Sequence, residues 1–250
     1  MERISLGFKV LQENLWLWFV ALGLNLLVFF VGIITKTLKL VPPGIHLKLG
    51  MPNGIPEMSN ILQQPQTHGI NIDLSPAFIV FILVAPYLAG GFISSIFNIL
   101  KGYEISKETF MSDCKYFYLR MLAVNILTLL LLLAAFLPAL IFPPLIIVSI
   151  IFVMFYTYFW QLALIRDDLE IGEALYKGKS LFKDNLSNVL GLLIQIAVLS
   201  AIVSIPLNIL GQNVMGYLFS ILIWTYLGSI FVIAVISLFK DLEEKPGILD

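Results

Sequence analysis

Few side chains in this sequence have the type and spacing that chemistry requires. His46 and His68 are the only histidines, and they share one segment with Glu57 and Asp73, so residue types alone allow a metal site there. Their wide separation matches none of the compact ligand spacings that zinc sites use. We therefore expect a solvated loop at these positions and no metal.

Asp167 and Asp168 resemble a paired carboxylate, but they precede an expected helix, where negative charge offsets the positive end of the helix dipole. Asp167 and Glu170 also have the spacing of a capping box. Cys114, the only cysteine, excludes an intramolecular disulfide and a cysteine-cluster metal site, and we interpret it as a small apolar residue on a helix face. The sequence has no nucleophile elbow, phosphate-binding glycine loop or dinucleotide fingerprint. It predicts no catalytic residue, no metal and no cofactor, in a protein that is not an enzyme.

The surrounding elements are predicted to be membrane helices. The chain is 59% hydrophobic and only 12% charged, with a mean hydropathy of +0.96. Residues 121–165 and 185–239 contain no charged side chain, and at about 1.5 Å per residue across a core of about 30 Å each run holds two crossings. The predicted fold is all-α, a single polytopic membrane domain over residues 1–250, with six transmembrane helices at about 15–34, 75–100, 121–140, 144–165, 187–209 and 216–239.

Positive charge is distributed unevenly between the two sides that these spans connect. Of the 15 lysine and arginine residues, only Lys36, Lys39 and Lys48 fall in the loop 35–73. Because cytoplasmic loops are enriched in Lys and Arg, we expect both termini to be cytoplasmic and this loop to be exoplasmic. The first apolar run is too long for a signal peptide, so we expect it to stay as a span.

The exoplasmic loop 35–73 is rich in proline and glycine. Within it, residues 45–49 and 70–74 alternate apolar and polar side chains, which predicts two short strands. Such a ribbon is not stable alone and would rest on the membrane or on a partner.

The cytoplasmic segments suggest an internal repeat. Glu108, Phe110 and Phe117 match Glu173, Leu175 and Phe182 at one constant offset, and residues 7–15 match 178–186. We interpret the chain as three units, each a short amphipathic helix at the cytoplasmic interface followed by a transmembrane hairpin. In the second unit Ser106 is a plausible cap, and Cys114 shares an apolar face with the two phenylalanines.

The third amphipathic helix, predicted over residues 168–185, is the candidate docking element. Its lysines Lys177, Lys179 and Lys183 are placed to contact anionic lipid headgroups or a partner protein, with Glu173 pairing to Lys177 along the helix. The alternative is that these short helices are ordinary connectors packed under the bundle. We expect no nucleic-acid partner.

Inside the predicted spans no ionisable side chain appears, although transporters and channels usually have one. The neutral polar residues there are explained by interhelical hydrogen bonds; they are Asn25, Asn125, Thr128, Gln161, Gln195, Asn208 and Thr225. In the second span the small residues Gly90, Gly91, Ser94 and Ser95 form a face where another helix is expected to approach closely.

Two segments, 159–168 and 173–185, carry a resemblance. They include Phe159-Trp160-Gln161-Leu162-Ala163-Leu164-Ile165, Asp167-Asp168, Glu173-Ala174-Leu175 and Ser180-Leu181-Phe182-Lys183-Asp184-Asn185. Here the chain resembles six-span bacterial membrane proteins related to the membrane domain attached to some glycerophosphodiester phosphodiesterases. The hydrolase activity of those enzymes lies in a separate soluble domain, so the resemblance implies a non-catalytic membrane module, located in the bacterial plasma membrane.

The sequence therefore favours a non-enzymatic membrane accessory or scaffold protein that organises lipids or partner membrane proteins. The alternative is a permease-type subunit of an exporter. The two differ in one structural feature, because a permease needs a continuous polar or water-filled path, whereas a scaffold can be packed solid.

Overall fold

The structure is a computed structural model that describes residues 1–36, 55–56, 76–135, 145–211 and 213–244. In these residues it contains eight helices and no strand. The helices are α1 (Glu2–Glu13), α2 (Leu15–Ile34), α3 (Pro76–Leu100), α4 (Lys107–Ala135), α5 (Leu145–Arg166), α6 (Ile171–Asp184), α7 (Leu186–Leu210) and α8 (Val214–Glu244). The all-helical prediction is confirmed for this part of the chain. The two predicted strands and both histidines lie outside it.

Among the described residues, five helices are long and apolar enough to cross a membrane: α2, α3, α4, α7 and α8. A multi-pass membrane protein is therefore supported. The predicted span 144–165 coincides with α5, a helix of 22 residues that is not one of these five.

Capping chemistry explains where α3 ends and where α4 begins. After Leu100 the backbone N–H of Tyr103 donates to the Asn98 carbonyl and that of Gly102 to the Ile99 carbonyl, at 3.0 and 2.9 Å. This is a Schellman-type ending, in which Gly102 adopts a φ of 86° that other residues rarely reach. The Ser106 hydroxyl then accepts from the Thr109 N–H at 3.1 Å, which confirms the predicted cap of α4.

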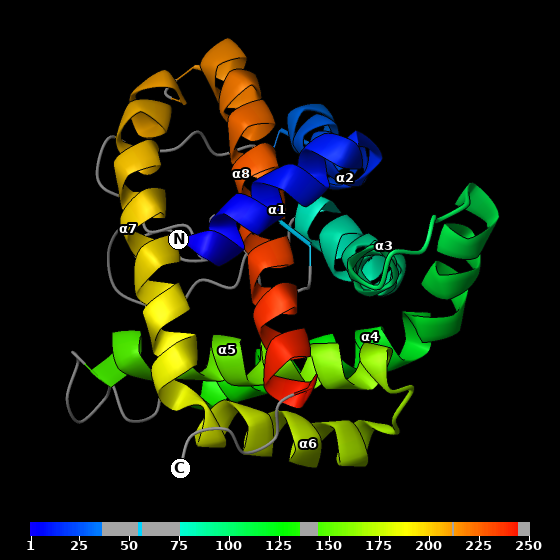
Figure 1. Ribbon diagram of the computed structural model, residues 1–250. Helices are drawn as coiled ribbons and strands as arrows, with labels where there is room; N and C mark the ends of the chain where they lie inside the picture. Colours follow the sequence, from blue (N-terminus) through cyan, green and yellow to red (C-terminus); the bar gives the residue numbers. More distant parts are fainter. Residues whose placement is uncertain (37–54, 57–75, 136–144, 212, 245–250) are drawn as a thin grey trace.

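The first and third predicted units share the same helix junction. α1 and α2 are separated at Asn14, whose side chain donates to the Val10 carbonyl at 3.0 Å. α6 and α7 are separated at Asn185, which donates in the same way to Leu181 at 3.1 Å. In the second unit Arg120 occupies the matching position, and the helix continues through it as α4. Figure 1 shows this helix changing direction along its length instead of breaking.

The three units contact one another in a closed cycle. We call α1–α3 the first unit, α4–α5 the second and α6–α8 the third. Each hairpin pairs its own two long helices, α2 with α3, α4 with α5 and α7 with α8. The amphipathic part of each unit packs on the last helix of the preceding unit, so that α4 lies on α3, α6 on α5 and α1 on α8.

The last helices of the three hairpins, α3, α5 and α8, contact one another at the centre. Their meeting point is aromatic, because the ring of Phe239 lies 6.0 Å from that of Phe97 and 5.6 Å from that of Phe159. Every residue of α8 from Gly228 to Phe239 is buried, as expected for a helix that is apolar on all sides and enclosed by others.

The hairpins spread from this centre in different directions. Figure 1 shows α7 and α8 running alongside each other, with α5 and α6 lying across their lower ends and α1 crossing α8. The predicted bundle is therefore not a set of parallel helices.

Candidate functional site

Two helices approach each other closely at the small-residue face of α3. A Cβ atom added to Gly90 would lie 2.8 Å from the Phe117 Cβ, and one added to Gly91 would lie 2.8 Å from the Phe110 carbonyl oxygen and even closer to the Cys114 sulfur. Both glycines are buried. This face of α3 is therefore filled by the first half of α4.

The two serines of this face have different surroundings. Ser94 donates from its hydroxyl to the Asp113 carboxylate on α4 at 2.6 Å, which adds a polar tie to the glycine contact. Ser95 is fully buried. Cys114 is buried on α4 against Gly91, as a small apolar residue would be.

The same kind of close contact recurs at the other two joins between units. A Cβ on Gly7 of α1 would lie 2.5 Å from the Ile230 carbonyl oxygen of α8, and one on Gly178 of α6 would lie 2.8 Å from the backbone nitrogen of Trp160 on α5. The Trp160 indole also donates to the Ile171 carbonyl at 2.9 Å. Each join is thus made where one helix has only a hydrogen atom in place of a side chain.

A cluster of charged side chains lies where the C-terminal ends of α5 and α8 meet the middle of α6. The Lys177 ammonium donates to the Asp167 carboxylate at 2.6 Å and also to Glu243, and Glu243 forms a second ion pair with Arg166. We call Arg166, Asp167, Lys177 and Glu243 the charged cluster. The side chains of Arg166 and Glu243 are only 12% and 16% exposed. The ion pairs of the cluster therefore connect three helices and are partly shielded from water.

This cluster corrects three details of the sequence prediction. Lys177 pairs with Asp167 and Glu243 and not with Glu173. Asp167 therefore does not cap a helix, and α6 begins only at Ile171, with Glu170 in the cap position and no side-chain capping bond. The predicted capping box is wrong because the Asp167 carboxylate is already bound to Lys177.

Electrostatic effects follow the same contacts. Partial burial lowers the pKa of Lys177, but the hydrogen bonds to Asp167 and Glu243 outweigh it and raise the pKa above its ordinary value. Asp168 accepts from the Tyr116 hydroxyl at 2.7 Å and pairs with Arg120 at 2.6 Å, and these bonds lower its pKa. Asp167 and Asp168 thus bind separate partners and do not act as a carboxylate pair.

Lys179 and Lys183 differ from Lys177. Both are exposed on α6, near Tyr176, whose side chain is 78% exposed. Of the three predicted docking lysines, Lys179 and Lys183 are exposed on the protein surface, while Lys177 is bound to Asp167 and Glu243.

Several neutral polar residues of the long helices bind across helices, as predicted. Gln161 of α5 donates to Asn125 of α4 at 3.0 Å, and the Trp18 indole of α2 donates to Thr225 of α8, also at 3.0 Å. Asn25 instead donates to the carbonyl of Pro56 at 2.8 Å, and Pro56 lies against Gly228.

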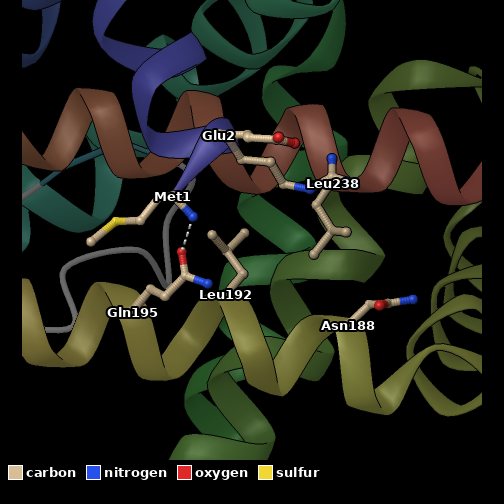
Figure 2. A pocket seen from close by; sticks show the side chains of 7 residues that line it. Met1, Glu2, Asn188, Leu192, Gln195 and Leu238 are labelled. Atoms are coloured by element: carbon tan, nitrogen blue, oxygen red, sulfur yellow. Dashed lines mark hydrogen bonds between the residues drawn. The ribbon is translucent and has the colours of Figure 1, made fainter.

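A recess of about 230 Å³ lies between α1, α7 and α8 (Figure 2). It is lined by Met1, Glu2, Arg3, Asn188, Leu192, Gln195 and Leu238. The Met1 nitrogen donates to the Gln195 side chain at 2.6 Å, and Arg3 pairs with Asp241 at 2.7 Å. The sequence did not indicate this recess, because its walls come from segments that are far apart in the sequence, residues 1–3, 188–195 and 238.

Taken together, the described residues form an all-helical fold of three joined units, with five helices long and apolar enough to cross a membrane. Within the part of the chain that the structure describes, no group of three or more His, Cys, Asp or Glu side chains could hold a metal ion. No known family, no curated protein and no solved structure matches this chain.

Proposed function

We propose that this protein is a non-enzymatic, multi-pass membrane scaffold. In this proposal both termini and the amphipathic helices lie on the cytoplasmic side. Two contacts support this arrangement, since Lys240 near the end of α8 donates to the Leu100 carbonyl at the end of α3 at 2.8 Å, and Arg166 at the end of α5 pairs with Glu243. The ends of α3, α5 and α8 thus lie close together, as expected if all three face the same side of the membrane.

The observation that carries the scaffold proposal is the filled centre. Phe97, Phe159 and Phe239 occupy the place where α3, α5 and α8 meet, and the Arg166 guanidinium lies 5.5 Å from the Phe97 ring, closing the cytoplasmic end. An exporter subunit would need a polar path along such an axis. The geometry favours a solid module that works through its surface.

The working surface is the exposed side of α6. Lys179 and Lys183 lie there beside Tyr176, an arrangement suited to an anionic membrane surface, where the aromatic side chain contacts the interface and the ammonium groups approach the headgroups. The protein would gather anionic lipid, or a partner bound to it, around the third unit.

The double variant Lys179→Gln with Lys183→Gln tests this role. Each lysine near an anionic surface contributes about 1 kcal/mol, so we expect retention of anionic lipid during purification to fall on the order of tenfold. Lipid mass spectrometry of the purified protein measures it. Because both side chains are exposed, the melting temperature should not change.

Lys36→Gln is the matched control. Lys36 is also an exposed lysine, but it follows the C-terminal end of α2, on the side opposite the amphipathic helices in this proposal, so its replacement should leave lipid retention unchanged. If the double variant retains the same lipids and co-purifying proteins as the parent, α6 is only a connector, and the scaffold proposal loses its main support.

A further inference from the structure

One of the three joins between units has no chain connection of its own. Residues 101–106 link the first unit to the second, and residues 167–170 link the second to the third. The third and first units meet only through side-chain and helix contacts, including Gly7 on Ile230 and Arg3 with Asp241. The recess shown in Figure 2 lies at this join.

We propose that this recess binds the zwitterionic headgroup of a phospholipid of the phosphatidylethanolamine type, taken from the cytoplasmic leaflet. The proposal rests on the membrane orientation given under Proposed function, and it names a second lipid site that is separate from the α6 surface. About 230 Å³ far exceeds the roughly 15 Å³ that one water molecule requires, so the recess has room for a ligand group.

The lining offers one group for each part of such a headgroup. The Arg3 guanidinium has five N–H donors, and only one of its nitrogens donates to Asp241. The remaining donors are available for a phosphodiester. Asn188 adds an amide from α7. Glu2, an exposed residue of the lining, supplies a carboxylate for a primary ammonium group.

The balance of charge selects among headgroups. The lining carries three ionised groups: the Met1 ammonium, which donates to Gln195, the Arg3 guanidinium, which pairs with Asp241, and the Glu2 carboxylate. A zwitterion brings a cation to Glu2 and a phosphodiester to the remaining donors of Arg3, whereas phosphatidylglycerol offers Glu2 no cation. Phosphatidylcholine has a cation but no N–H donor for the carboxylate. Ethanolamine satisfies both demands.

The recess also has apolar surface for the rest of the lipid. Leu192 and Leu238 form walls from α7 and α8. One turn beyond Glu2 on α1, Leu6 is 38% exposed and lies on the same side of the helix, so it offers an apolar surface where the glycerol and acyl chains leave the recess.

The test uses the full chain in vesicles of equal parts phosphatidylethanolamine, phosphatidylcholine and phosphatidylglycerol, followed by mass spectrometry of the bound lipid. We expect the parent to retain phosphatidylethanolamine severalfold above phosphatidylcholine. Glu2→Gln should bring that ratio close to one, since the charge-assisted hydrogen bond that distinguishes the two headgroups is lost. Leu192→Trp, which fills the recess, should abolish the enrichment.

Glu13→Gln is the matched control, because Glu13 is an exposed carboxylate on the same helix and away from the recess. Equal retention of the zwitterionic lipids by the parent, or enrichment that persists in Leu192→Trp, would overturn the proposal. Displacement of the lipid by soluble glycerophosphoethanolamine at low concentration would overturn the assignment to a membrane lipid. Phosphatidylglycerol retention in the same samples reports on Lys179 and Lys183, so the scaffold proposal stands or fails independently.

Discussion

Replacing Gly90 and Gly91 together with leucine is expected to lower the free energy of unfolding by about 3 kcal/mol or more. The added Cβ atoms would meet the Phe117 side chain and the Phe110 backbone at 2.8 Å, and backbone cannot move aside as a flexible side chain can. For a chain of this size we expect the apparent melting temperature in detergent to fall by roughly 6–12 °C. A fluorescence-detected melting curve of the purified protein measures it.

Gly191→Leu is the control for this experiment. Gly191 is a helical glycine like the other two, but nothing lies within 4 Å of its added Cβ, and it is exposed on α7. Its replacement should leave the melting temperature unchanged or raise it slightly, because leucine favours a helix more than glycine does. Equal melting temperatures for the double variant and the parent would mean that α4 does not pack on this face of α3.

Removing the charge of Glu243 should have the second largest effect. Glu243→Gln keeps the size of the side chain but leaves Arg166 and Lys177 without their shared carboxylate. Exposed ion pairs contribute about 0–1 kcal/mol and breaking a fully buried pair costs about 3–5 kcal/mol, so for this partly buried cluster we expect a loss of about 2 kcal/mol. Thermal unfolding at neutral pH measures it.

Glu244→Gln provides the comparison at the next position. Glu244 is 52% exposed, and its carboxylate lies 3.8 Å from Arg166 and 4.0 Å from Lys240, so its replacement should change stability by less than about 1 kcal/mol. If the Glu243→Gln and Glu244→Gln variants have the same melting temperature, the charged cluster does not hold α5, α6 and α8 together in the native protein.

The long helices were predictable because a lipid environment leaves few alternatives. A charge-free run must be helical when no water is present to bind its backbone, which placed α2, α3, α7 and α8 within a few residues of their observed bounds. The repeat was predictable where its residues were kept, as at Asn14 and Asn185. It failed at Arg120, where no asparagine interrupts the helix and α4 continues through.

The side-chain partners were not predictable from the sequence. Lys177 has Glu173 as a near neighbour along its helix, yet it binds Glu243, which is 66 residues away. Such pairing depends on how α6 sits against α8, and helical periodicity contains no information about this. The recess at the join of the first and third units was hidden for the same reason.

The most direct test of the central claim is cysteine accessibility in intact cells. The claim is that all three amphipathic segments lie on one, cytoplasmic, face. Single cysteines at Lys9, Lys115 and Lys179 sample the three segments, and one at Lys36 samples the opposite end of α2; all four positions are exposed, whereas the native Cys114 is buried. We expect a membrane-impermeant maleimide to modify only the cysteine at Lys36 until the cells are permeabilised. Modification from outside at any of the other three positions, or protection of Lys36, would contradict the account.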